Sequence, residues 1–116
     1  MKIAVCIGEG PYNHEAADSA YHFIRAALDR GHQIQGIFFY HDGVHNVNAL
    51  MDPPQDERHM ANRWSALGAT GIHIVACVTA AKRRGAMDQV SHVELAGLGQ
   101  LAMMTIQADR LVCFGD

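Results

Sequence analysis

Residues 3–11 have the sequence Ile-Ala-Val-Cys-Ile-Gly-Glu-Gly-Pro, in which a short apolar run leads into a loop. The run from Ile3 to Ile7 is β-branched, which is typical of a buried strand, and the glycines and proline that follow end it. From His14 to Leu28 the apolar residues fall on one helical face, and Gly31 is placed to end that helix. The first part of the chain therefore predicts a strand, a loop and a helix, in that order.

The same alternation continues to the end of the chain. Strands that alternate with helices favour parallel pairing through right-handed crossovers, with helices on both faces of the sheet. We therefore expect an α/β fold, a three-layer sandwich with a mostly parallel sheet of about five strands, in one domain spanning residues 1–116. The remaining predicted elements are a strand at 33–40, at most a short helical piece at 44–51, a helix at 56–67, a strand at 71–77, a short helix at 79–85, a last helix from about Glu94, and a strand at 111–114.

Composition and charge exclude several classes of protein. A chain of 116 residues that is 49% hydrophobic can bury a core without disulfides or a structural metal. Its formal net charge of -3 argues against binding nucleic acid through the whole surface. Because no stretch has the length of a membrane span or of a signal-peptide core, we expect no membrane contact and a location in the reducing cytoplasm.

Ligands of such sheets gather beyond the carboxyl ends of the strands, which directs attention to residues 8–13, 40–48 and 77–84. The first segment contains Gly8-Glu9-Gly10 but lacks the third glycine of a dinucleotide fingerprint, and Glu9 would repel a pyrophosphate. A tight turn between strand and helix explains these glycines equally well.

The eight histidines invite a metal-site hypothesis. His41 and His45 could share a helical face near Asp42, but no third ligand stands at a diagnostic spacing, so we expect surface histidines without a metal. His73 alternates with apolar neighbours, which favours a hydrogen-bonded histidine in the core or at its rim.

The three cysteines differ in their surroundings. Their odd number, wide spacing and lack of a CxxC pair argue against a disulfide framework and a zinc site. Cys6 and Cys113 lie within apolar strands, where we expect thiols that pack as small hydrophobic groups. Cys77 ends a strand before a helix that carries basic residues 82–84. The unpaired N–H groups at the start of that helix and the positive charges of the basic residues would both favour the Cys77 thiolate. From these residues alone, a functional and a structural role for Cys77 are equally supported.

Several segments, taken in order along the chain, form a recognisable series of motifs. The most specific are the stretch Phe38-Phe39-Tyr40 with Gly43-Val44, Asn46 and Asn48, and Cys77 with its downstream Arg83-Arg84-Gly85. The others are Gly10-Pro11-Tyr12, the run at 16–21, Gly31-His32, Ala80-Ala81, Gly97-Leu98-Gly99 and Ala108-Asp109-Arg110. In these segments the chain resembles the DsrE/TusD family of sulfur-transfer proteins.

The resemblance implies a flavodoxin-like (DsrEFH-like) fold and a sulfurtransferase that carries a persulfide on Cys77 without a cofactor. It also implies a hexamer, built from this chain or with DsrF/TusC-like and DsrH/TusB-like subunits, a TusA-like sulfur donor and a TusE/DsrC-like acceptor. The sulfur would serve either tRNA 2-thiouridine formation or sulfur oxidation. The alternative hypothesis is a non-catalytic subunit or small-ligand-binding module of a DsrE-like oligomer.

Two features depart from the pattern of the family. The segment 86–93 after the cysteine is shorter than in TusD proteins, which bears on partner docking. His41 and His45 stand where the family leads us to expect a basic residue and a tyrosine. Neither change removes a group that thiolate chemistry needs.

Overall fold

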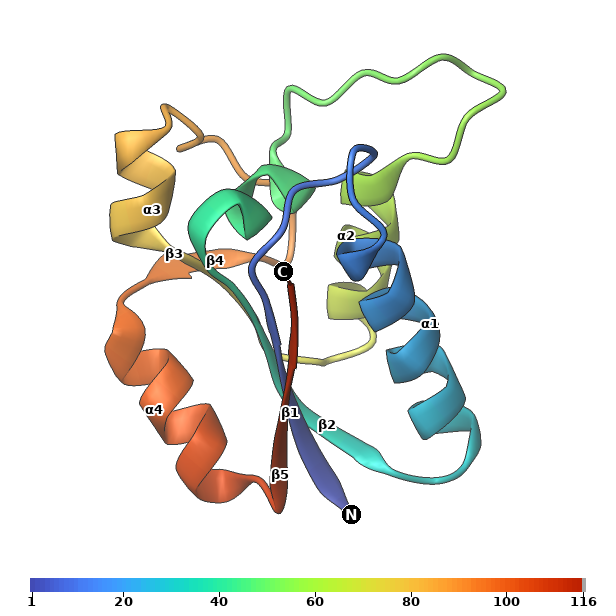
Figure 1. Ribbon diagram of the computed structural model, residues 1–116, viewed down its shortest axis with the longest axis vertical. Coiled ribbons are helices and arrows are strands. Elements are labelled where there is room, and N and C mark those ends of the chain that lie inside the picture. Colours follow the sequence, from blue (N-terminus) through green and yellow to red (C-terminus); the bar gives the residue numbers. More distant parts are fainter. Residues whose placement is uncertain (116) are drawn as a thin grey trace.

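The computed structural model describes residues 1–115, which form one five-stranded sheet with helices on both faces (Figure 1). The strand order is β4-β3-β2-β1-β5, and every described strand pair is parallel. This confirms the predicted α/β class and the sheet of five strands. The elements are β1 (Lys2–Ile7), α1 (Ala16–Asp29), β2 (Gln33–Phe39), the 3₁₀ helix η1 (His41–Val47), α2 (Met60–Ala69), β3 (Ile74–Cys77), α3 (Val78–Arg83), β4 (Glu94–Ala96), α4 (Leu98–Gln107) and β5 (Arg110–Phe114).

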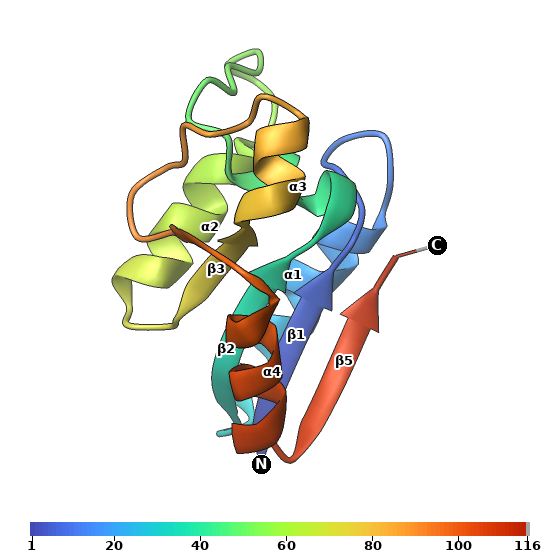
Figure 2. The same ribbon diagram turned by 90° about the vertical axis from the view of Figure 1, so that its left-hand side faces the viewer.

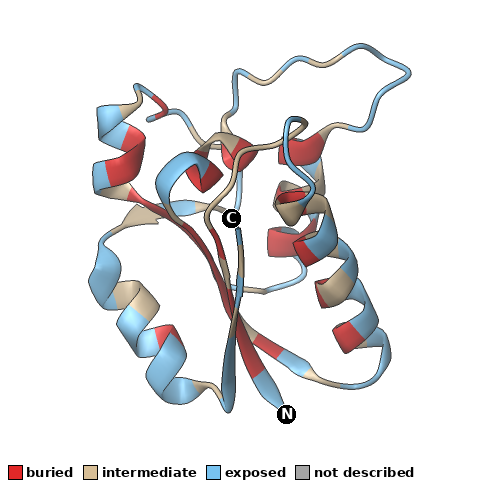
Figure 3. Cartoon of the chain, in the orientation of Figure 1, coloured by how far each residue is buried: buried red, intermediate tan, exposed pale blue. Residues whose placement is uncertain are grey.

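One face of the sheet is covered by α1 and α2 (Figure 1). Buried Trp64 of α2 meets Phe39 of β2 edge-on, with ring centroids 5.1 Å apart, and Tyr21 of α1 at 5.5 Å. The central strands are buried along most of their length (Figure 3). Parallel strands buried on both faces are mostly apolar, as the sequences of β1 and β2 are.

The other face is covered by α4, which packs closely on β2. A Cβ atom on Gly36 would lie 2.6 Å from the Met104 sulfur, so glycine is what lets this helix approach the strand. Figure 2 shows β5 at one edge of the sheet, where β1 is its only partner among the strands formed by residues 1–115.

The predicted start of the last helix at Glu94 is wrong. Residues Glu94–Ala96 form β4, which pairs with β3 from Val75 to Cys77 and satisfies backbone groups on that side of β3. Gly97 then caps α4 in an extended conformation. Leu95 happens to share a helical spacing with the apolar residues of α4, so periodicity joined two elements that strand pairing separates.

None of the helices in the described part of the chain combines the length and apolar character that crossing a membrane requires.

Candidate functional site

Cys77 lies at the carboxyl end of β3, where the chain turns into α3. All four residues of β3 are buried, and the Cys77 side chain is only 3% exposed. Its extended backbone makes it the residue that precedes the first turn of α3. Side chains on this strand end therefore meet the ends of β2 and β4, at the sheet edge where α/β proteins place their ligands.

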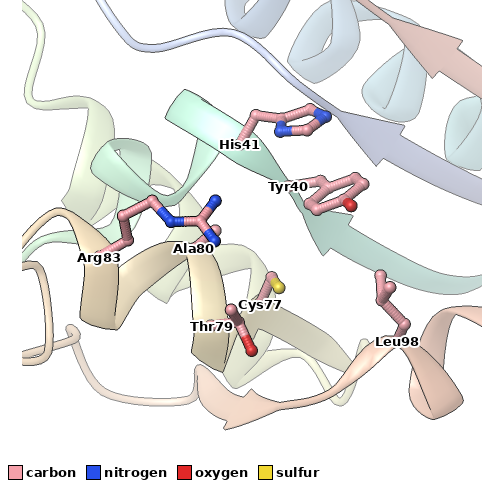
Figure 4. Close-up of a pocket in the computed structure, with 7 residues that line it drawn as sticks. All are labelled: Tyr40, His41, Cys77, Thr79, Ala80, Arg83 and Leu98. Atoms are coloured by element: carbon pink, nitrogen blue, oxygen red, sulfur yellow. The ribbon is translucent and has the colours of Figure 1, made fainter.

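The Cys77 sulfur faces a pocket of about 170 Å³. Figure 4 shows the sulfur between Thr79 on one side and Tyr40 and His41 on the other. The pocket is large enough for one or two added atoms on the thiol and offers both polar and apolar contacts. The residues that line it are Tyr40, His41, Cys77, Thr79, Ala80, Arg83 and Leu98.

The three basic residues after Cys77 have different roles. Arg83 lines the pocket and is the one that can favour an anion on the sulfur. Arg84 is engaged elsewhere, because its Nε donates to Asp42 Oδ1 at 2.7 Å and its guanidinium also donates to the Ala80 carbonyl at 3.1 Å. Lys82 is exposed and does not line the pocket. Of the three predicted basic residues, only Arg83 lines the Cys77 pocket.

Tyr40 and His41 form one wall of the pocket. Their rings are stacked with centroids 3.9 Å apart and an angle of 13°. The Tyr40 N–H donates to the Ile7 carbonyl at 2.9 Å, and buried Asn46 donates to the Glu9 and Gly43 carbonyls, each at 2.9 Å. These bonds fasten η1 to the end of β1 and so hold the wall in position.

Sequence reasoning missed Leu98 as a pocket residue. It covered Thr79 only as part of the segment 77–84 and did not single it out. Leu98 comes from α4 and lies in the pocket only because the β4 pairing brings the start of α4 next to β3.

A family model described as DsrE/DsrF-like matches residues 1–114. The chain belongs to the DsrE/DsrF-like family. Its relatives include a DsrE protein of Allochromatium vinosum, which is 49% identical over 130 aligned positions that cover all of both chains. The name of that relative assigns it as a sulfurtransferase provisionally. They also include the sulfurtransferase TusD of Proteus mirabilis, 38% identical over 98% of this chain and all of the relative. These full-length relatives support a sulfur-transfer role.

Solved structures share the fold of this DsrE/DsrF-like chain. The ychN protein from E. coli matches with a TM-score of 0.86 and 21% identity, over 98% of this chain and 99% of that one. A protein of unknown function from Methanobacterium thermoautotrophicum matches with a TM-score of 0.72 and 14% identity, over 97% of each chain. At these identities the likeness concerns the fold alone.

Of the two histidines considered as a metal pair, His41 is exposed and His45 is half-buried. Among residues 1–115 no group of three His, Cys, Asp or Glu side chains could hold a metal ion. His73 lies at the rim, where its ring contacts Glu94 Oε1 at 2.8 Å.

The prediction that Cys6 and Cys113 are core thiols is wrong for Cys113. Cys113 is exposed and Cys6 is half-buried. The reason is the place of β5 at the edge of the sheet (Figure 2), where α1 packs against Phe114 on one face of the strand and Cys113 on the opposite face is exposed. An apolar strand sequence does not distinguish an edge from a centre.

The segment 86–93, expected to be short for this family, folds against the body of the protein. Its backbone bonds to η1 and the residues after it, with Val90 N–H donating to the Val47 carbonyl and Ala49 N–H to the Asp88 carbonyl. It does not line the Cys77 pocket. The first alignment runs over 130 positions although this chain has 116 residues, so that relative carries insertions.

Proposed function

We propose that this protein is a sulfur carrier that holds a persulfide on Cys77. The observation that supports this most directly is the pocket, since of the three cysteines Cys77 alone lines it together with Arg83. The sulfur-transfer role of the family members supports the same residue, which occupies the position that the family resemblance assigns to the carrier.

Both transfer steps balance without an oxidant or a cofactor. The Cys77 thiolate attacks the outer sulfur of a donor persulfide, the donor cysteine leaves as a thiolate, and Cys77 becomes Cys-S-SH. An acceptor thiolate then attacks the outer sulfur on Cys77, and Cys77 leaves as the thiolate that began the cycle. Arg83 lines the pocket in which both thiolate states of Cys77 form.

The proposed partners follow from the same chemistry. The donor is a TusA-like persulfide protein, and the acceptor is a TusE/DsrC-like protein that presents a cysteine on an extended segment. The sulfur then enters tRNA 2-thiouridine formation or sulfur oxidation in the cytoplasm. Contact with tRNA runs through the acceptor, because the chain carries a net charge of -3.

We further propose that residues 1–116 act as one domain within an oligomer, a hexamer of this chain alone or with DsrF/TusC-like and DsrH/TusB-like subunits. In helix α4, the exposed fractions are 50% for Leu98, 48% for Met103 and 76% for Ile106. Leu111 of β5 is also exposed. Such apolar surface is typical of subunit contacts. Leu98 also lines the Cys77 pocket, so a subunit seated on α4 would extend that pocket. Sedimentation at 12.7 kDa, the mass of the monomer, would contradict the oligomer.

The 3% exposure of Cys77 favours one alternative, a non-catalytic subunit or small-ligand-binding module in which this thiol only packs. The relative rates at which native Cys77, Cys6 and Cys113 react with iodoacetamide separate the two functions. A carrier requires Cys77 to react faster than both Cys6 and Cys113.

The decisive experiment loads the protein from a persulfide donor and maps the adducts by peptide mass spectrometry. We expect the Cys77 peptide to gain the mass of one sulfur atom, and Cys77→Ser to lose transfer to an acceptor thiol. Cys6→Ser serves as the matched control and keeps the transfer. Full transfer by Cys77→Ser would refute the carrier function.

A further inference from the structure

Cys6 and Cys113 lie side by side on neighbouring strands. They are directly paired in the register of β1 and β5. Because paired residues of neighbouring strands point to the same face, both sulfurs lie on the face that α4 covers elsewhere. They line a second pocket of about 230 Å³, whose other residues are Gly8, Tyr40, His41, Phe114 and Gly115.

This thiol pair is open to small molecules. Cys113 is exposed, and the residues two positions further along each strand are Gly8 and Gly115, which place no side chain beside the sulfurs. Close backbone packing does not require these glycines. A Cβ at Gly8 would lie 3.9 Å from the Phe114 carbonyl oxygen, and a Cβ at Gly115 would lie 3.7 Å from Glu9 Cγ, both ordinary contacts. Their effect is to leave the pair uncovered.

We propose that Cys6 and Cys113 form a second thiol site, which exchanges with low-molecular-weight disulfides and closes to a reversible disulfide. The Cys113 thiolate attacks a disulfide R-S-S-R, one R-S⁻ leaves and takes up a proton, and a mixed disulfide forms on Cys113. The Cys6 thiol then loses its proton and attacks the Cys113 sulfur, and the second R-S⁻ leaves. In total, two protein thiols are oxidised to one disulfide and R-S-S-R is reduced to two R-SH.

The two thiols are suited to different steps. Burial, with the neighbouring Cys113, raises the pKa of Cys6 to about 11, so Cys6 stays protonated and is a poor first nucleophile. The other titratable groups that line the pocket are Tyr40 and His41. Once Cys113 is in a mixed disulfide it carries no charge, so its part in raising the Cys6 pKa disappears. The second step, in which Cys6 attacks the sulfur of Cys113, then proceeds because the two residues are paired on neighbouring strands.

The backbone permits the bond. Neighbouring strands lie about 4.8 Å apart, within the range of roughly 4.4 to 6.8 Å that separates the Cα atoms of natural disulfides. β5 pairs only with β1, so this edge strand can shift to bring the sulfurs together. Exposed disulfides have more oxidising potentials and are readily reduced again, which makes the proposed bond reversible.

The site is separate from Cys77. The stacked rings of Tyr40 and His41 line both pockets and stand between the two sets of sulfurs. The disulfide therefore forms whether or not Cys77 carries a persulfide, and the proposal does not depend on the proposed function.

The test equilibrates the full-length protein in glutathione buffers of graded oxidised fraction, traps free thiols with iodoacetamide and maps the peptides by mass spectrometry. We expect a Cys6–Cys113 disulfide, equally in Cys77→Ser. We expect Cys6→Ser to accumulate glutathione on Cys113, because the second step is lost, and Cys113→Ser to leave Cys6 reduced. Iodoacetamide should label Cys6 on the order of 100-fold more slowly than an ordinary thiol.

Three results would overturn the proposal. These are a disulfide that involves Cys77, no disulfide in fully oxidised glutathione, and glutathione that persists on Cys113 of the unmutated protein. Because the last two are read on the unmutated chain, they hold even if a serine variant fails to fold.

Discussion

The Cys77 pocket and the Cys6–Cys113 pair lie on the same face of one sheet, yet they offer a sulfur opposite surroundings. Cys77 is 3% exposed, stands beside Arg83, and has no second cysteine among the residues that line its pocket. Cys113 is exposed on an edge strand and has Cys6 directly across from it. One site encloses a single thiol, and the other pairs an exposed thiol with a half-buried one.

This difference decides what each site can hold. A persulfide next to a second thiol is short-lived, because that thiol attacks the inner sulfur, forms a disulfide and releases hydrogen sulfide. A persulfide on Cys77 meets no such neighbour within its pocket and waits for an acceptor. The pair at Cys6 and Cys113 cannot store sulfur in this way but can undergo reversible oxidation. Isolation of the thiol, more than its reactivity, distinguishes a carrier from a redox pair.

The largest effect is expected from a substitution that displaces the wall formed by Tyr40 and His41, which lines both pockets. A Cβ on Gly43 would overlap the Ile7 carbonyl oxygen, so Gly43→Ala must displace η1 from the end of β1. We expect a loss of about 3 kcal/mol in the free energy of unfolding. Denaturant titration measures it. The control is Gly99→Ala, whose Cβ would meet nothing within 4 Å and which should be neutral or slightly stabilising. Equal stability of the two variants would contradict this account of the wall.

The next prediction converts the enclosed thiol into a pair. Thr79 lines the pocket beside Cys77, so Thr79→Cys places a second thiol within reach of the persulfide. We expect the loaded variant to release hydrogen sulfide as Cys77 forms a disulfide with the introduced cysteine, with the persulfide lifetime shortened at least about tenfold. Sulfide release and persulfide decay are followed together. Thr79→Ser, which keeps the hydroxyl, should leave the lifetime unchanged.

If Thr79→Cys holds its persulfide as long as the unmutated protein, isolation of Cys77 is not what preserves the sulfur. In that case the contrast between the two sites would rest on exposure alone.

A smaller effect is expected from the charge beside Cys77. Among the residues that line the pocket, Arg83 is the only lysine or arginine. We expect Arg83→Gln to make iodoacetamide react with Cys77 about 3-fold to 10-fold more slowly, less so at high salt. Lys82→Gln makes the same change in charge one residue away, outside the pocket, and serves as the control. Reaction at Cys113 should be the same in both variants. Equal slowing of Cys77 by both would assign the effect to net charge.

The sequence was sufficient to predict the alternation of strands and helices, the α/β class and the place of Cys77 at a strand end. These features depend on local periodicity and on glycines such as Gly31, which adopts a positive φ of 84° just after α1. The start of α4 was predicted wrongly because β4 exists only through its pairing with β3, which no local pattern encodes.

The candidate site was predictable only in part, for the same reason. Position along the chain indicated Cys77 and its basic residues, but not that Arg84 bonds to Asp42 while Arg83 lines the Cys77 pocket. The pairing of Cys6 with Cys113 joins residues from opposite ends of the chain. It follows from β5 lying next to β1, a topological fact that the apolar sequences of the two strands do not reveal.

The smallest effect concerns the ion pair that joins two walls of the Cys77 pocket. Arg84 Nε donates to Asp42 Oδ1 at 2.7 Å, linking the end of α3 to η1. This hydrogen bond lowers the pKa of Asp42, with nearby His45 and His41 adding to the shift. A lowered pKa in the folded state means that the pair stabilises the fold above the ordinary aspartate value of about 4 and that this contribution is lost as the pH falls through the lower folded value. Because both side chains are at least partly exposed, the gain is small.

Asp42→Asn should therefore lower the unfolding midpoint slightly at pH 7 and not at all at a pH below the folded pKa of Asp42, where the unmutated protein has also lost the charge. Thermal unfolding at the two pH values measures the difference. The same variant should raise the reactivity of Cys77 by less than about twofold, since a looser link between α3 and η1 opens its enclosed pocket. Cys113 lies beyond the Tyr40 and His41 wall and should not respond. If the reactivity of Cys113 rose as much as that of Cys77, the ion pair would stabilise the whole carboxyl end of the sheet, and one opening motion would expose both sites.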